Sequence, residues 1–348
     1  MPNVTRLIDL GEVSGLRSQC VYHALSECIG IDSEPTLILT SPTEPCVSVG
    51  LYQETERNVD TRACRDANLP IFRRMLGGRA MIIDSGQMLF QTVFPASRAA
   101  RSATKLYNDV LRSAVETYRH FGIDVHYLPV SDIRVRNARL GGSAIGRLGD
   151  AIVLASGIVL DYNDELARRV LKTVDCDYTS IAEQTDHAPD PTAVRDHFLA
   201  EYETRMKTSL HLGMLTEAEW SAIKACEARI GDAAWVREVD DRIESLRRAP
   251  DADTRIGDGI YVAPGGQIRA TVRVKHDLID DLVLSGDFFF YEDHRHGLEQ
   301  AFLGTECTWE SLMTVTENYY LRNEVDSPGT EPSAWVTAID SALNNTDE

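Results

Sequence analysis

A double glycine between two short β-rich runs constrains the fold of this chain more than any other feature. The run Leu69–Phe72 leads into Arg73 and Arg74, Gly77–Gly78 follow, and the next run begins at Ala80. Glycine at both turn positions lets a ligand approach the backbone closely. Backbone N–H groups beside arginine form a site for phosphate or carboxylate. The segment predicts an anion-binding loop or, more plainly, a glycine-containing hairpin with surface arginines.

Short β-rich runs and helical patterns alternate through most of the chain. The runs are bounded by proline, glycine or polar turn residues, and the longest helical pattern stops at a glycine. We predict strands at Pro35–Thr40, Cys46–Gly50, Leu69–Phe72, Ala80–Ile83, Met88–Phe94, Val125–Tyr127, Asp132–Val135 and Ala151–Leu160. We predict helices at Thr61–Asn68, Ser97–Phe121, Asn163–Lys172, Thr192–Lys207 and Thr216–Arg229, the last opening with a capping box.

A second, smaller domain is expected at the C-terminal end. The polar segment Arg248–Asp258 contains a proline and is typical of a linker. Two strand patterns follow, Gly259–Val274 with a Pro-Gly-Gly turn and Leu278–Gly286, and then a helix at Arg295–Leu303. We predict domains at residues 1–247 and 252–348, the second of α+β type. We expect the last dozen residues to be frayed.

Composition excludes several classes of protein. The 348 residues carry a net charge of −19, and no dense Lys/Arg cluster is present, so we expect no nucleic-acid partner. No apolar stretch approaches the roughly 20 residues that span a bilayer, and the N-terminus has no signal-peptide pattern. We therefore expect no membrane association and a cytoplasmic protein. Seven widely spaced cysteines without a C-x-x-C pair indicate reduced thiols.

The segment Arg73–Gln87 has the pattern R-R-x-x-G-G-x-A-x-x-x-D-x-G and resembles the signature of lipoate–protein ligases and the related octanoyltransferases. The resemblance runs from about residue 36 to about residue 305. Further segments resemble this family in the same order: Val47–Gln53, Ser131–Val135, Arg139–Ala144, Gly157–Asp161, Leu215 with Trp235, Gly265–Arg269 and Gly286–Phe289.

This resemblance implies an α/β (α+β) fold, with a mixed, mostly antiparallel sheet flanked by helices. A helical connector would end the catalytic domain, and the C-terminal domain would be the family's accessory domain. The implied protein is an enzyme that uses ATP and Mg²⁺ to convert lipoate into lipoyl-adenylate and pyrophosphate. A lysine of a lipoyl-type carrier domain then attacks the adenylate and releases AMP. Such a site must neutralise a triphosphate and hold a carboxylate in line with the α-phosphorus.

Site residues follow from the matched motifs. Arg139 and Asp132 are the expected catalytic residues, and Asp132 is also the expected magnesium ligand. The expected substrate- and adenylate-binding residues are Arg74, Gly77, Gly78, Arg79, Ala80, Met81, Ile82, Gln87, Gly142, Ser143 and Ala144.

The chain departs from the family pattern at several polar positions. Arg139 replaces the family's lysine, which keeps the charge but changes the geometry. Arg79 replaces a glycine, as in the octanoyltransferase branch. Cysteine-dependent octanoyltransferases carry their nucleophile just before the strand that begins near Ser131, and His126–Val130 contain no cysteine. Other family residues are replaced by Leu76, Ile83, Gln87, Ser131 and Ser156.

Four functions remain open. The first is ATP-dependent activation of lipoate or a related small carboxylic acid and transfer to a carrier-domain lysine. The second is octanoyl or lipoyl transfer without ATP, which Arg79 favours and the missing cysteine opposes. The third is a non-catalytic homologue that binds a carrier protein. The fourth is a ligase of a specialised pathway, with an unusual acid and a small amine acceptor. Release of pyrophosphate from ATP separates the ligases from the other two.

Overall fold

The computed structural model describes residues 3–97, 103–128, 132–172, 177–186, 188–248 and 253–347. The chain forms two compact units. The first contains Met1–Ser48, Val59–Arg74 and Met81–Asp232, and the second contains Val49–Asn58, Met75–Ala80 and Ala233–Glu348. Ser131 and Cys176 lie outside the described residues. The domain boundary expected between residues 247 and 252 stays a prediction.

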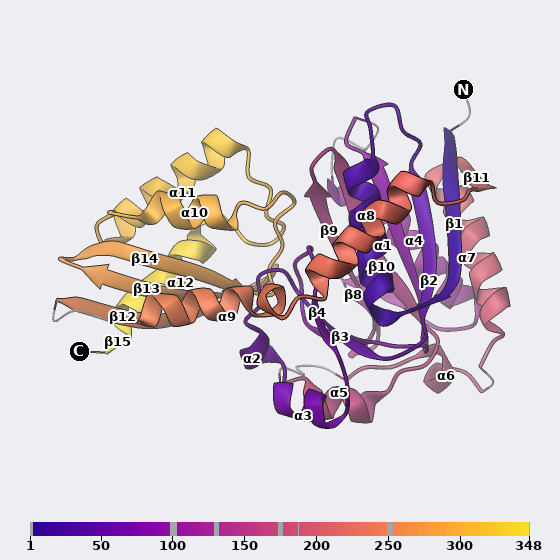
Figure 1. Cartoon of the computed structure of the whole chain (residues 1–348), viewed down its shortest axis with the longest axis horizontal. Coiled ribbons are helices and arrows are strands. Elements are labelled where there is room, and N and C mark those ends of the chain that lie inside the picture. Colours follow the sequence, from indigo (N-terminus) through magenta and orange to yellow (C-terminus); the bar gives the residue numbers. More distant parts are fainter. Residues whose placement is uncertain are drawn as a thin grey trace. The chain divides into compact units, whose positions relative to one another are not determined.

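An eight-stranded mixed sheet forms the centre of the first unit among the residues described (Figure 1). The strand β1 pairs in parallel with both of its neighbours, and the remaining pairs are antiparallel. The predicted mixed, mostly antiparallel sheet is confirmed. In spatial order the strands are β11 (Thr208–Leu212), β1 (Asn3–Val13), β2 (Thr36–Pro42), β6 (Gln87–Pro95), β10 (Ala151–Val159), β9 (Ala138–Leu148), β8 (Asp132–Val135) and β7 (His126–Leu128).

Helices cover both faces of this sheet. On one face lie α1 (Gly15–Cys28) and α8 (Glu217–Ile230), and on the other lie α4 (Ala103–His120) and α7 (Pro191–Met206). Alternation along the strands assigns the faces. The Gln91 amide donates to the Ser18 carbonyl of α1, so Gln91 faces α1. The ring of the preceding residue, Phe90, contacts Phe198 of α7 and therefore faces the other side. The capping box predicted at Thr216 is present at the start of α8.

A small three-stranded sheet also belongs mainly to the first unit. It is built from β4 (Ile71–Arg73), β3 (Cys46–Val49) and β5 (Met81–Ile83), in that order. Short helices complete the unit: α3 (Thr61–Asp66), α5 (Asp164–Val170) and α6 (Ile181–Gln184). The two runs on either side of the double glycine are therefore strands, as predicted, but both pair with β3 and not with each other.

The second unit has its own antiparallel sheet and core. The strand order is β14 (Leu278–Gly286), β13 (Gly266–Lys275), β12 (Thr254–Ala263) and β15 (Thr346–Asp347). Its helices are α2 (Thr55–Asn58), α9 (Ala233–Arg247), α10 (Arg295–Phe302), α11 (Trp309–Asn323) and α12 (Pro332–Asn344). Trp335 of α12 is fully buried and stacks on Phe290.

Two expectations about the C-terminal part are wrong. The last dozen residues are not frayed, because α12 buries Val336, Ala338 and Ile339 in the core and β15 adds a strand to the sheet. The polar segment Arg248–Asp258 is not linker throughout, because β12 begins at Thr254. Its pairing with β13 compensates for a polar sequence, since strand partners supply hydrogen bonds that local composition does not reveal.

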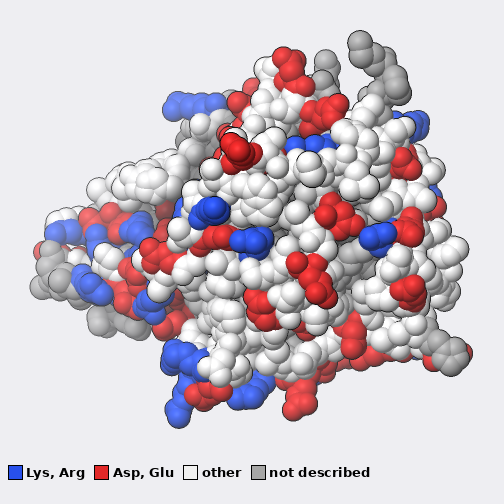
Figure 2. Space-filling view, turned by 45° about the vertical axis from the view of Figure 1, so that its right-hand side comes forward, with Lys and Arg blue, Asp and Glu red and all other residues white. Residues whose placement is uncertain are grey.

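Acidic side chains dominate the charge of the surface. Figure 2 shows Asp and Glu side chains interspersed with fewer Lys and Arg side chains over the face in view. Many of the arginines are paired with carboxylates, for example Arg237 with Glu56, Asp241 and Glu244. Among the described residues, no helix has the length and apolar character that a membrane span requires.

A buried carboxyl group in the second unit makes stability depend on pH. Glu299 accepts a hydrogen bond from the Leu284 backbone N–H at 2.8 Å, and burial raises its pKa to about 7. The pKa of Glu299 is therefore higher in the folded chain than in the unfolded chain. This difference stabilises the folded chain at low pH, and the stabilisation is lost as the pH rises from about 4.5 towards 7. We expect Glu299→Gln to remove this slope and to raise the free energy of unfolding at pH 8 by about 2–3 kcal/mol.

Urea denaturation of the full chain at several pH values measures this effect. Glu310→Gln, at an exposed position in the first turn of α11, is the matched control and should keep the wild-type slope. An unchanged slope in Glu299→Gln would show that another group causes the pH dependence.

Candidate active site

Two predicted catalytic residues lie together on neighbouring strands of the large sheet. The Arg139 guanidinium contacts Asp132 at 2.9 Å, and Arg134 contacts the other oxygen of the same carboxylate at 2.8 Å. The Arg139 side chain is 11% exposed and that of Asp132 15%. A Cβ atom added at Gly142 would overlap with the Arg139 guanidinium. Glycine at this position therefore allows the cation to lie flat on the sheet.

The backbone of Arg139 is fixed on its other side. Its N–H donates to the Asp177 carbonyl at 2.8 Å, and its own carbonyl accepts from the Thr179 N–H at 2.9 Å. The ring of Tyr178, between these two residues, stacks on Tyr162. These contacts hold the start of β9 in place and restrict where the long Arg139 side chain can reach.

Arg74 is buried between β4 and α1. Its Nη1 donates to the Ser48 carbonyl at 3.1 Å and to the Ser48 hydroxyl at 3.3 Å, and that hydroxyl donates to Gln19 of α1 at 2.7 Å. Burial lowers the pKa of Arg74 to about 10, and the charge of Arg139 acts in the same direction. The two guanidinium groups therefore lie within range of each other's field, and Arg74 stays protonated at neutral pH.

The residues predicted after the double glycine mainly build the small sheet. Ile82 is fully buried in β5 opposite Val47, and Met81 is partly buried. Gln87 donates its amide to the Ile82 carbonyl at 3.1 Å, which holds β5 beside β6. The Ser156 hydroxyl donates to the Gly142 carbonyl at 3.0 Å, and Ser143 lies opposite Ser156.

The glycine loop itself, Met75–Ala80, belongs to the second unit. The Gly78 N–H donates to the Phe288 carbonyl at 3.3 Å, and a Cβ atom at Gly77 would overlap with the same carbonyl. Arg79 pairs with Asp287 at 2.8 Å. The predicted residues Gly77, Gly78 and Arg79 thus contact the segment that begins at Gly286, a link that the sequence analysis did not predict.

Asp287 is expected to matter more for stability than its partner Arg79. One Asp287 oxygen contacts Arg79, and the other accepts from the Gln267 backbone N–H. Asp287→Ala leaves that N–H without its acceptor and should lower the free energy of unfolding by about 1–3 kcal/mol. Arg79→Ala removes a partly exposed ion pair, and such pairs contribute at most about 1 kcal/mol.

Chemical denaturation of the two variants checks the difference. Asp280→Ala is the control, because Asp280 also pairs with an arginine, Arg273, but is more exposed. It lies on β14, which ends just before Asp287. Equal losses in Asp287→Ala and Asp280→Ala would contradict the role given to the Gln267 contact.

Sequence analysis missed the helix α1 and the polar residues that it presents. Gln19, Ser18 and Tyr22 are buried, and the Gln19 amide donates to the Ser18 hydroxyl at 3.3 Å. Gln91 of β6 donates to the Ser18 carbonyl at 3.1 Å. The available signal was the run of helix-compatible residues from Gly15 to Cys28, which includes Gln19 and Tyr22 between apolar residues. Such polar residues are seldom buried without partners.

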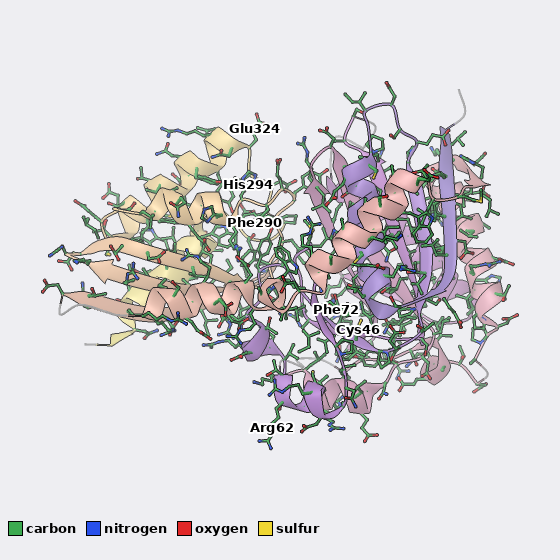
Figure 3. The ribbon with its side chains drawn as sticks, in the orientation of Figure 1. Cys46, Arg62, Phe72, Phe290, His294 and Glu324 are labelled. Atoms are coloured by element: carbon green, nitrogen blue, oxygen red, sulfur yellow. The ribbon has the colours of Figure 1, made fainter. Side chains whose placement is uncertain are left out.

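Cys46, Cys20 and Cys226 are buried in packed surroundings. Cys46 is buried with Ile83 and Leu89, and Figure 3 places it near Phe72. Burial raises the pKa of Cys46 to about 12, which makes a thiolate nucleophile unfavourable there. Cys20 and Cys226 are buried neighbours at the contact of α1 with α8.

Asp132 fits a protein-held metal poorly in this arrangement. Both of its oxygens contact guanidinium groups, and no group of three metal-binding side chains occurs in the described part of the chain. A Mg²⁺ ion that enters with a nucleotide needs few protein ligands, because phosphate and water supply most of its shell. Asp132 as a magnesium ligand therefore stays a prediction, and no step below depends on it.

Comparison with known proteins agrees with these features. The family model described as the lipoyl protein ligase A/B catalytic domain matches residues 21–203, which is more than half of the chain. Lipoate–protein ligase 2 of Staphylococcus aureus is 24% identical over 292 residues, covering 78% of this chain and 80% of that protein. An octanoyltransferase, LipM of Geobacillus kaustophilus, is 23% identical over 163 residues, covering 40% of this chain and 58% of that protein.

Solved structures share the fold. A lipoate–protein ligase A bound with ATP has a TM-score of 0.61 at 19% identity, covering 67% of this chain and 98% of that one. A bipartite lipoate–protein ligase from Thermoplasma acidophilum, described with its E2 lipoyl domain, has a TM-score of 0.60 at 18% identity, covering 67% and 96%. The extent of the family match shows that the chain belongs to the lipoyl protein ligase A/B family and is an enzyme of that family.

Proposed function

We propose that this enzyme activates lipoate or a related carboxylic acid with ATP as an acyl-adenylate and transfers the acyl group to an amine, first of all a carrier-domain lysine. The observation that carries the proposal is the Arg139 guanidinium, which lies on Gly142 beside Asp132 and within the field of the buried Arg74. Two cations in a largely buried place suit a carboxylate and a phosphate that react with each other.

The reaction has two balanced steps. A carboxylate oxygen of the acid attacks the α-phosphorus of ATP, and pyrophosphate leaves. The acceptor amine then attacks the acyl carbon, AMP leaves, and the nitrogen loses a proton. Arg139 would contact the carboxylate and the α-phosphate, where negative charge changes most during the first step.

The other predicted residues would position the reactants. Arg74 would bind the adenylate, and Gly77, Gly78 and Arg79 of the glycine loop are the other residues that we propose for this role. The short side chains of Ala80 and Ala144 would leave room for the acyl chain. Met81, Ile82, Gln87, Gly142 and Ser143 are the other residues that the matched motifs assign to substrate binding.

The relatives support this proposal. One structural neighbour is bound with ATP, and another is described with its lipoyl domain, which supports ATP as co-substrate and a lipoyl carrier domain as partner. Two relatives that cover most of this chain are lipoate–protein ligases. Membership of an enzyme family argues against the non-catalytic alternative. A specialised ligase with an unusual acid and a small amine acceptor remains compatible with the same cationic site.

Octanoyl transfer without ATP is the second candidate. The octanoyltransferase relatives favour it, as does Arg79 in the glycine loop. Transfer through a nucleophilic cysteine needs a thiolate, and burial raises the pKa of the Cys46 and Cys64 thiols. We therefore place ATP-dependent activation first.

Release of pyrophosphate tests the proposal. The full chain is incubated with MgATP and, separately, lipoate, octanoate and other acids, first without acceptor and then with a lipoyl domain. Acid-dependent release, followed by acylation of the lipoyl domain, is the expected result. Acylation from an octanoyl thioester without ATP would establish the transferase. Folded protein that does neither would overturn both.

A further inference from the structure

A row of four residues crosses the α1 face of the large sheet. Ala144, Ala155, Gln91 and Ile38 lie directly opposite one another on the adjacent strands β9, β10, β6 and β2. Directly opposite residues in antiparallel strands project to the same face. The Gln91 contact with Ser18 identifies this face as the one covered by α1.

Arg139 lies over the same face. Gly142 is two residues before Ala144 on β9, so both positions face the same way. The Arg139 guanidinium occupies the space above Gly142, where a side chain at that position would project. A ligand carboxylate held at Arg139 could thus extend its chain across this face towards Gln91.

Small residues leave this route uncovered by the protein's own side chains. Gly142, Ala155 and Gly157 are partly exposed although they lie in inner strands of the sheet. Inner strands are normally covered on both faces, so the partial exposure of Gly142, Ala155 and Gly157 indicates room for a ligand over this part of the face.

The side-chain oxygen of Gln91 is a buried hydrogen-bond acceptor on the face of the sheet that α1 covers. Its side chain is buried, with 2% of the residue exposed, and its Nε2 donates to the Ser18 carbonyl at 3.1 Å. Because a carbonyl accepts and cannot donate, the amide must keep its nitrogen on Ser18 and its oxygen on the other side. That oxygen has no hydrogen-bond partner among the described residues.

Two further buried hydroxyl groups accompany it. Thr40 lies opposite Leu89, two residues from Gln91 on β6, so it projects to the same face. Tyr22 of α1 is close enough to Arg74 to interact with its charge. Neither hydroxyl oxygen has a partner in the described part of the structure. Native proteins leave few such atoms unpaired, and a group of them beside a candidate site points to a polar ligand.

We infer that the acid bound by this enzyme carries a hydrogen-bond donor, such as a hydroxyl or amide N–H, towards the far end of its chain, and that Gln91 selects it. This inference rests on the proposed function. Gln91 lies two strands and two residues from Gly142, roughly 10–12 Å away. An acid about as long as octanoate spans a distance of this order. Octanoate and lipoate bring no donor, and would leave the Gln91 oxygen buried against apolar atoms.

The test compares acids of matched length. The kcat/KM for pyrophosphate release is measured with octanoate, 6-hydroxyoctanoate and 8-hydroxyoctanoate, and binding of the same acids is measured by calorimetry. We expect at least one hydroxylated acid to exceed octanoate about tenfold or more in the wild type. Gln91→Leu should abolish or reverse that preference, and Gln91→Met is the second variant if the first does not fold.

Thr92→Val is the matched control. Thr92 is the next residue of β6, is fully buried and also has an unpaired hydroxyl, but it faces the α4 side. Its variant should keep the wild-type preference. Preference of the wild type for octanoate, or an unchanged preference in Gln91→Leu, would overturn the inference while leaving acid activation intact. If no acid releases pyrophosphate, the proposed function fails, and the calorimetric preference still decides the role of Gln91.

Discussion

Replacing Arg139 by alanine is expected to slow acid-dependent pyrophosphate release by about 100- to 1,000-fold, the usual cost of removing a preorganised contact to developing charge. The guanidinium lies on Gly142 and is held by Asp132, so it is positioned before substrate binds. Loss of the side chain also removes one of the cations that pair with the Asp132 carboxylate, which makes the site more negative towards the phosphate. Both effects slow the same step.

Arg139→Lys separates charge from geometry. Lysine restores the residue that the family pattern carries, but it lacks the planar fork that spans Asp132 and a ligand. We expect a rate between those of the wild type and Arg139→Ala. Arg147→Ala, at the far end of the same strand, should change the rate at most slightly. Turnover by Arg139→Ala equal to the wild type would remove Arg139 from the site.

Gly286→Ala is expected to have the largest effect on stability. Gly286 has φ +146°, and an added Cβ atom would overlap with the Gln267 carbonyl in the partner strand β13. Its N–H also donates to the Tyr52 carbonyl at 2.9 Å, so the backbone cannot shift without losing that bond. Strain and overlap together should lower the free energy of unfolding by about 3–5 kcal/mol.

Gly304→Ala isolates the contribution of the overlap. Gly304 has φ +74° in the same unit, but nothing lies within 4 Å of its added Cβ atom. Its variant should lose only about 1 kcal/mol, the cost of a left-handed alanine. Urea denaturation of both variants measures the difference, and similar losses would show that the close approach to Gln267 is not the cause.

Gly286→Ala has a second consequence. Asp287 and Phe288, the next two residues, contact Arg79, Gly77 and Gly78 of the glycine loop. A displaced turn at Gly286 should therefore disturb the loop and reduce pyrophosphate release along with stability. Gly304→Ala should leave activity unchanged.

The local sequence pattern is sufficient to predict helices that have regular apolar spacing or a recognisable cap. The helix over Ala103–His120 has regular apolar spacing and a glycine after its last turn, and it was predicted. The helix α8 begins at a Thr216 capping box whose two hydrogen bonds join residues three apart. Such signals lie within one turn of chain, so they need no tertiary information.

The helix α1 was missed because its surroundings are not encoded locally. Gly15, Ser18, Gln19, Cys20, Val21, Tyr22 and His23 are all buried, since α1 packs against both the sheet and α8. A helix that is buried on nearly every side has no polar face, so its sequence does not show apolar residues at helical spacing against a polar background. Its polar residues then look like an irregular segment.

For the site, the chemical types of the residues could be predicted from the sequence: three arginines, an aspartate, a double glycine and small residues at motif positions. Which of these residues contact one another depends on the three-dimensional fold. It joined Arg139 to Asp132 and Gly142, assigned Gly77, Gly78 and Arg79 to the unit that contains Gly286, and left Gln91 with an unpaired oxygen on the face of Arg139. The reason is physical. Side-chain chemistry and turn propensity belong to single residues and their neighbours, whereas hydrogen-bond satisfaction and close backbone approach depend on strands and helices far apart in the chain.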